Sequence, residues 1–332
     1  MQHPRFTENQ TGLGNWSKVS FRGSDLRTSV GIPIVLLCLA AGVGARAQQS
    51  APHGPDCCAI PPGPNPKEVI GRVIDGAKEA DRAQYLYERI ERVESRKDSG
   101  DSAPQSVKIS RVIPAGTGIT RIPLGSDGKP LDADAYRSEL DNLLKSLIWA
   151  AESGQPQREA YQKVQKKVKD RDELIEATRN AFIFTLVGQE QRGDRMLSKY
   201  RMEPNPAFKS TSRATSIFAK VKGFVWADDA SHQLARVQGE VTDDISLGIF
   251  LGKVYKGSRF LQDRYELAPG LWLPSFTQYD FDGRKFFTNF SVHERTFYSA
   301  YKHIGPPAEA IPQIQAEIQR LDALKSKPSI DR

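Results

Sequence analysis

Three stretches of the chain repeat apolar residues every three or four positions, the spacing of one helical face. They are residues 68–80, residues 132–152, where leucines and isoleucines recur, and the isoleucines and leucines from 311 to 324. A glycine and a proline follow the second stretch, and two prolines precede the third, which fits helix ends at those places. The pattern therefore predicts an N-terminal, a central and a C-terminal helix.

A fourth predicted helix, residues 158–179, is mainly polar. It carries seven basic and five acidic side chains. Opposite charges three or four residues apart stabilise an exposed helix through ion pairs, and we expect that role here. The alternative is a patch that binds nucleic acid or a membrane.

After residue 180 the pattern changes to runs rich in Val, Phe, Tyr and Trp, mostly separated by Gly, Pro, Asp or Ser. Six such runs in succession are typical of antiparallel strands with short turns. Residues 107–124 predict two further strands, and residues 83–94 favour a strand after a short helical lead. The predicted fold class is α+β, a strongly curved antiparallel sheet of about eight strands with helices packed over it or inserted between strands.

The first 47 residues predict a secretory signal peptide. An apolar run of about 15 residues follows two arginines and ends in Ala45-Arg46-Ala47, so we expect cleavage after Ala47. Residues 48–67 are rich in proline and predict a linker; Cys57 and Cys58 within it are expected to be two exposed thiols, with a disulfide as the alternative. The predicted domain is 68–305, with a helical insert at 132–179, and residues 306–332 form the C-terminal helix.

The charge of the whole chain is +7, from 47 basic and 40 acidic residues. Removal of the predicted signal peptide takes five basic and two acidic residues with it, so the remaining charge is modest. We therefore expect no nucleic-acid partner and at most a transient contact with a membrane.

The stretch GFVWADDASHQL, residues 223–234, contains two aspartates, a histidine and a tryptophan. Asp228 and Asp229 could be a catalytic carboxylate pair, metal ligands or a hairpin turn. Asp-Asp-Ala-Ser is good turn composition, and adjacent carboxylates in a tight turn point apart and into water, so we expect a turn. The same argument applies to Asp243 and Asp244.

No catalytic or cofactor motif is present. The sequence lacks G-x-S-x-G, G-x-G-x-x-G, a P-loop and H-x-x-x-H, and His232, His293 and His303 have no cysteine partner after residue 58. We therefore predict no catalytic residue, no metal site and no cofactor.

Aromatic residues on the predicted strands are the remaining candidates for a site. A curved sheet with an aromatic concave face under helices could hold an apolar ligand, although each residue could equally belong to an ordinary core. Phe218, Phe224 and Trp226 are separated by even numbers of residues, so we expect them on the same side of one strand. By the same spacing, Trp272 and Phe276 are expected on the same side of another strand. The predicted lining residues are Phe218, Phe224, Trp226, Trp272, Phe276 and Phe281.

The order of these segments resembles the outer-membrane lipoprotein-sorting (LolA-like) family. The resemblance lies in FAKVKGFVWADDASHQLARVQGEV, KGSRF and APGLWLPSFTQYDFDGRKFF, within residues 182–301. It implies an open half-barrel with helices as a lid, which binds an acyl chain of a lipid or lipoprotein in the periplasm without catalysis. The proline-rich start and the helical insert depart from the compact carriers of that family.

Two other functions remain open from the sequence. A secreted hydrolase acting on cell-envelope material would be favoured if His232 or His293 lay within hydrogen-bond reach of a carboxylate inside a pocket. An envelope interaction module, with a protein partner on helix 158–179, would be favoured if the protein's own side chains filled the space under the helices.

Overall fold

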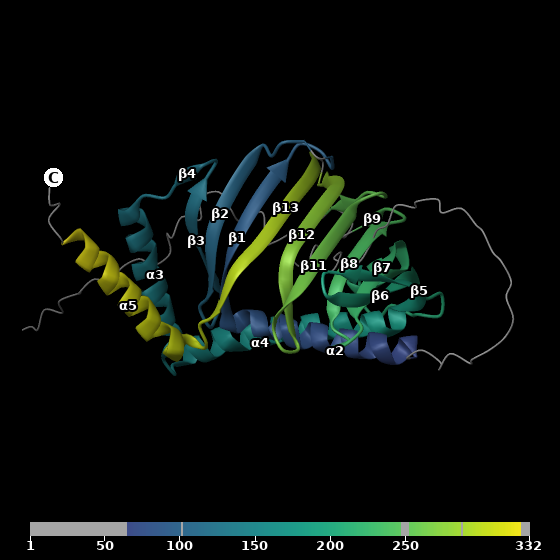
Figure 1. Cartoon of the computed structure of the whole chain (residues 1–332), viewed down its shortest axis with the longest axis horizontal. Coiled ribbons are helices and arrows are strands. Elements are labelled where there is room, and N and C mark those ends of the chain that lie inside the picture. The colour runs from purple at the N-terminus through teal and green to yellow at the C-terminus, as the bar shows by residue number, and fades with distance from the viewer. Residues whose placement is uncertain (1–64, 101, 247–251, 287, 327–332) are drawn as a thin grey trace, which may run out of the picture.

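The computed structural model describes residues 65–100, 102–246, 252–286 and 288–326 (Figure 1). The predicted signal peptide, most of the predicted linker, Cys57 and Cys58 lie outside these residues. The described helices are α2 (Pro66–Ala83), α3 (Ala133–Ala151), α4 (Gln155–Ala181) and α5 (Pro307–Lys325), with the 3₁₀ turns η1 (Gln84–Leu86) and η2 (Thr215–Lys220). The strands are β1 (Tyr87–Arg96), β2 (Ser106–Pro114), β3 (Ile119–Ser126), β4 (Lys129–Pro130), β5 (Phe182–Arg192), β6 (Arg195–Pro204), β7 (Val221–Asp228), β8 (Leu234–Val241), β9 (Ile245–Ser246), β10 (Lys253–Val254), β11 (Arg259–Ala268), β12 (Leu271–Lys285) and β13 (Thr288–His303).

Helices α2 and α3 begin after residues whose side chains accept hydrogen bonds from their first free N–H groups. Asn65 accepts a hydrogen bond from the Lys67 amide at the start of α2, and Asp132 accepts from the amides of residues 134 and 135 at the start of α3. Pro66 and Pro307 occupy first-turn positions, where a missing N–H costs nothing. All four predicted helices are confirmed.

The strands form one antiparallel sheet, in the order β4-β3-β2-β1-β13-β12-β11-β8-β7-β6-β5, with β9 and β10 joined to β12. The sheet does not close, because β4 and β5 lie at its two ends. It is strongly twisted and curved, with helices along it in Figure 1. The predicted fold class, α+β with a curved open antiparallel sheet, is confirmed.

The sheet has thirteen strands, whereas the sequence predicts about eight. Three of the additional strands, β4, β9 and β10, contain two residues each, too short for a periodic pattern. The sequence pattern also does not predict β6, RMLSKYRMEP, in which arginines, a lysine and a serine interrupt the apolar residues. Pairing with strands on both sides, rather than local alternation, makes this segment a strand.

Two helix pairs cover opposite faces of the sheet. Helices α2 and α4 lie together along one face, called the inner face here, where α2 packs on β7, β8 and β12 (Figure 1). Helices α3 and α5 pack on the other face, called the outer face, against Ile113 of β2 and Ile122 of β3. Cross-strand pairing relates Ile122 to Arg111 and Arg111 to Ile90, so the three side chains lie on the same face of the sheet. On β1, this face points away from α2. The predicted helical insert 132–179 therefore contributes one helix to each face.

Candidate ligand-binding site

The inner face carries the largest apolar cluster of the described residues, called the inner cluster. Helix α2 contributes one stripe to it, and β5 to β8, β11 and β12 contribute the facing side chains. From α2 these are Val69, Ile70, Val73, Ile74 and Ala77, and from the sheet and η2 they include Phe182, Tyr200, Met202, Phe218, Val225, Val237, Phe260 and Phe281. Helix α2 thus contacts this part of the sheet through apolar side chains.

Ion pairs hold α2 to α4. Lys78 meets Glu176 at 2.7 Å, Arg179 meets Asp75 at 2.9 Å, and Arg82 pairs with Asp172. Within α4, Lys166 and Asp170 pair at 2.9 Å, one helical turn apart. Charges of the polar helix pair within α4, as expected from the sequence, and others pair with α2, which the sequence does not predict.

Glu176 gives this helix pair a dependence on pH. Hydrogen bonds from Arg179 and Lys78 lower the pKa of Glu176 to about 2 from the usual 4.5. A lowered acid pKa means that the stabilisation is present above pH 4.5 and is lost as the pH falls towards 2. We expect Glu176→Gln to flatten the fall in unfolding free energy over this window, measured by urea unfolding at several pH values. An unchanged pH profile in Glu176→Gln would show that the pair contributes nothing measurable.

The six predicted lining residues lie on two faces of the sheet. Phe218 and Phe281 are buried in the inner cluster. Trp226 and Trp272 are buried in a separate cluster with Leu197 and Ala235, against which Phe224 packs; it is called the outer aromatic cluster. Phe276 is half-buried and contacts Phe297, with 5.1 Å between the ring centroids.

The prediction that Phe218 shares a face with Phe224 and Trp226 is wrong. Phe218 lies in η2, so strand parity does not extend to it. Within β7 the side chains alternate, and Val225 belongs to the inner cluster while Trp226 belongs to the outer one. Whether any of the six residues binds a ligand stays a prediction.

Cations flank the aromatic rings of the outer aromatic cluster. The Lys199 ammonium lies 4.8 Å from the ring centroids of both Phe224 and Trp226, and the Arg236 guanidinium lies 5.6 Å from that of Trp226. Arg195 lies 5.4 Å from the ring of Trp272. These contacts are attractive, and the cationic side chains cover the indole of Trp226, which contributes to its burial.

The two aspartates of GFVWADDASHQL lie at a hairpin turn between β7 and β8, as expected. They are not equivalent, however. Asp228 is fully buried, and its Oδ1 accepts hydrogen bonds from the Ser231 amide at 2.8 Å, the Ser231 hydroxyl at 2.7 Å and Arg195 at 3.2 Å. Asp229 is half-buried and accepts from Gln189 at 2.7 Å. The expectation that both carboxylates point into water is therefore wrong for Asp228, whose carboxylate fixes the turn.

Asp228→Ala should lower the free energy of unfolding by about 1.5–3 kcal/mol, because three donors around a buried carboxylate lose their acceptor. Asp229→Ala removes one hydrogen bond at a half-buried position and should cost about 1 kcal/mol or less. Urea unfolding of the two variants measures the difference. Equal losses would mean that the Asp228 contacts do not hold the turn.

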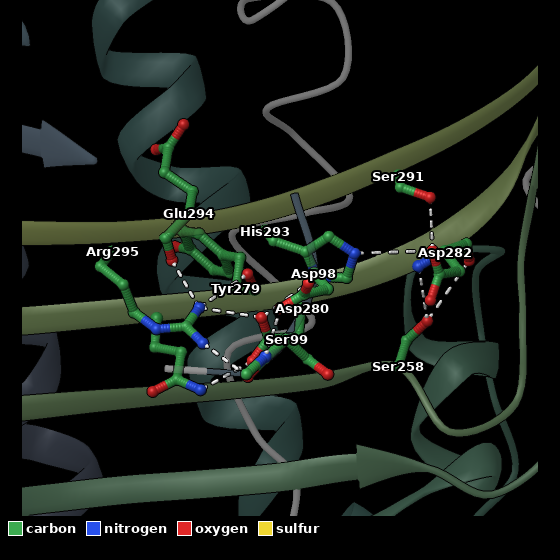
Figure 2. A network of polar contacts seen from close by, with 12 residues as sticks. Asp98, Ser99, Ser258, Tyr279, Asp280, Asp282, Ser291, His293, Glu294 and Arg295 are labelled. Atoms are coloured by element: carbon green, nitrogen blue, oxygen red, sulfur yellow. Dashed lines mark hydrogen bonds and ion pairs between the residues drawn. The ribbon is translucent and has the colours of Figure 1, made fainter. Parts of the chain in front are cut away.

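His293 lies within hydrogen-bond reach of a carboxylate on the outer face. Its Nδ1 is 3.2 Å from Oδ1 of Asp280, both residues are buried, and Arg295 donates to the same oxygen at 2.8 Å (Figure 2). Ser291 donates to Asp282 at 2.5 Å, and His293 Nε2 is 3.8 Å from that carboxylate. A nucleophilic serine would need to donate to the histidine, so this arrangement is a charged network and lacks the order of a triad.

Two further features of the described residues bear on the site. No three His, Cys, Asp or Glu side chains among residues 65–100, 102–246, 252–286 and 288–326 are grouped closely enough to hold a metal ion. None of the helices in these ranges is long and apolar enough to cross a membrane.

The fold and the inner cluster place the chain in the class of open antiparallel sheets with an amphipathic helix over one apolar face. Comparisons of the sequence with protein-family models and with curated proteins found no match. A LolA superfamily protein from Nitrosomonas europaea is similar in structure, with a TM-score of 0.28 and 11% identity over 73% of this chain and 96% of that protein. An outer membrane lipoprotein-sorting protein domain from Vibrio parahaemolyticus has a TM-score of 0.24 and 12% identity, over 70% of this chain and 93% of that domain. Both proteins are named for the group that the sequence resembles. Their TM-scores and identities with this chain do not define a site or an activity.

Proposed function

We propose that the protein is a non-catalytic carrier or sensor that holds an acyl chain of a lipid or lipoprotein at the inner cluster. The observation that carries this proposal is the apolar cluster between α2 and the sheet. The protein's own side chains form that contact, the feature expected of an envelope interaction module, so an acyl chain enters only if α2 moves away from the sheet. An acyl chain that enters between α2 and the sheet replaces the contact between their apolar side chains by contacts with the chain. Each methylene of the ligand that is removed from water contributes about 0.8 kcal/mol to the free energy of binding. In this proposal α2 and α4 move as one unit, because ion pairs join them.

The proposed location is the periplasm. The predicted signal peptide and the resemblance of residues 182–301 to lipoprotein-sorting proteins support it. The proposed partners are a lipid or lipoprotein and, for delivery, a second envelope protein. Contact with a membrane is transient in this proposal.

The contact between His293 and Asp280 is the one observation that favours a hydrolase. Against that function, Asp280 already accepts from Arg295 and from Gln278 at 2.6 Å, and the nearby Ser291 donates to Asp282. The network therefore supports the pairing of β12 with β13, and we do not assign it a catalytic role.

Lipid mass spectrometry tests the proposed function. The full chain is produced with export to a periplasm, purified without detergent and extracted with organic solvent. We expect a stoichiometric acylated lipid in the extract and displacement of a fluorescent fatty acid by that lipid. No lipid in the extract, together with no binding of the fluorescent fatty acid, would contradict the proposal.

A further inference from the structure

The inward stripe of α2 changes from apolar to charged along the helix. Ile70, Ile74 and Ala77 pack in the inner cluster, and Asp81 continues the same spacing, seven residues or about 10 Å beyond Ile74. Asp81 is 4% exposed. The inner face therefore has an apolar region under most of α2 and a polar region at the C-terminal end of that helix.

Two irregularities in strand pairing lie at arginines of this polar end, Arg89 and Arg264. Arg89 lies in a register shift between β1 and β13, opposite Ala300, which has a positive φ of 51°. A second shift, between β11 and β12, lies at Arg264. The Tyr301 hydroxyl, next to the first shift, donates to the Pro274 carbonyl beside the second at 2.9 Å. Bulges of this kind redirect side chains and are common next to binding sites.

Arg89 is a buried cation with unused hydrogen-bonding capacity. It is 5% exposed, its Nε and Nη2 meet Glu91 at 2.9 and 2.7 Å, and its guanidinium lies 5.9 Å from the ring centroid of Tyr298. Its Nη1 has no hydrogen-bond partner. A buried N–H group without an acceptor raises the free energy of the folded protein, so an acceptor atom of a ligand would be stabilised at Nη1.

Asp81 and its neighbours complete the polar end. Oδ1 of Asp81 meets Arg171 at 2.8 Å, whereas its buried Oδ2 has no partner. Burial raises the pKa of Asp81, and the charges of Arg171 and Arg264 oppose that effect. Tyr85 lies in η1, four residues after Asp81 and four before Arg89. Burial raises the pKa of Tyr85, and the charges of Asp81, Arg171 and Arg89 also act on it. Four arginines (82, 89, 171 and 264) and three acids (Asp81, Glu91 and Asp172) contribute charge to this end, so positive charges exceed negative ones by one.

We propose that the polar end, made by Arg89, Asp81 and Tyr85, receives the anionic headgroup of an amphiphile whose acyl chain lies in the inner cluster. The inference rests on the proposed carrier function and narrows its ligand to chains that end in a carboxylate or a phosphate. The Arg89 Nη1 donates to an anionic oxygen of the headgroup, and the chain extends under α2 towards Ile70. A charge-assisted hydrogen bond of this kind, away from water, discriminates strongly against a neutral headgroup.

Three ligands with the same acyl chain test this proposal: a fatty acid, a lysophosphatidic acid and a neutral monoacylglycerol. We measure their affinities for the full chain by displacement of a fluorescent fatty alcohol, a neutral probe. We expect one or both anions to bind about tenfold or more tightly than the monoacylglycerol. Arg89→Gln should remove that preference without changing the affinity for the neutral ligand. The two anions distinguish a carboxylate from a phosphate.

Matched variants separate the role of Arg89 from a general charge effect. Arg121 also pairs with Glu91, at 3.5 Å, but its side chain is 57% exposed, so Arg121→Gln should leave the preference intact. Asp81→Asn removes a negative charge and should raise the affinity for the anions, the opposite sign to Arg89→Gln. If Arg89→Gln does not fold, two measurements still test the headgroup site. They are the preference of the unaltered protein for anions over the monoacylglycerol and the affinity of Asp81→Asn for the anions.

The outcomes distinguish the two proposals. Equal affinities for all three ligands would overturn the headgroup site and leave the carrier function standing. Binding of none of them, including the probe, would contradict the carrier function and the headgroup site together. An anion preference that survives in Arg89→Gln would place the headgroup elsewhere.

Discussion

Trp226→Ala is expected to lower the free energy of unfolding by about 3–5 kcal/mol and to leave the affinity for an acyl chain unchanged. The loss follows from removal of a buried indole, which leaves a cavity beside Leu197 and Trp272 and ends two cation–π contacts. The affinity is unaffected because Trp226 points to the face opposite the inner cluster. Urea unfolding and displacement of the fluorescent fatty acid measure the two quantities.

Phe286→Ala is the control for this prediction. Phe286 is also aromatic but 53% exposed, so its removal should change the unfolding free energy by about 0.5 kcal/mol or less. A loss of acyl-chain binding in a folded Trp226→Ala protein would move the site to the outer aromatic cluster.

Val225→Asp is expected to have a still larger effect, on both stability and binding. Val225 is adjacent to Trp226 in the chain but lies in the inner cluster, 4% exposed. A carboxylate there has no cation to pair with among the apolar side chains of the cluster, so we expect a loss of more than about 4 kcal/mol and no acyl-chain binding. Thermal unfolding measures the first effect.

Val225→Thr tests binding in a protein that folds. Threonine has nearly the shape of valine, and burial of its hydroxyl should cost about 1–3 kcal/mol. The same polar group facing the ligand should weaken acyl-chain binding by about tenfold, which corresponds to about 1.4 kcal/mol. Lys222→Thr, at an exposed position on the same strand, is the control and should change neither quantity. Unchanged binding in Val225→Thr would exclude the inner cluster near β7.

The helices and most strands follow from local patterns. The periodic apolar stripe of α2 predicts both the helix and its buried side, whereas the alternation in β7 and β8 predicts the strands but not which of their sides faces the helix. The sequence does not predict β6, because this strand forms by pairing with β5 and β7 despite its charged residues. The predicted face of Phe218 is wrong because this residue lies in a 3₁₀ turn, where strand alternation does not apply.

The sites depend even more on tertiary structure. The sequence predicts aromatic lining residues but not their division between two faces, since a curved sheet buries aromatic rings on both. The sequence does not single out Arg89, because an arginine in a strand usually faces water. Its burial follows from a bulge, and a bulge has no reliable signature in a single sequence.

Photo-crosslinking tests the central claim most directly. A fatty acid with a diazirine near the end of its chain is bound to the full chain, irradiated and mapped by mass spectrometry of the peptides. The proposed function predicts adducts on α2 and on inner-cluster residues such as Val225 and Phe281. Adducts confined to Phe224, Trp226 and Trp272, or no specific adduct at saturating ligand, would contradict it.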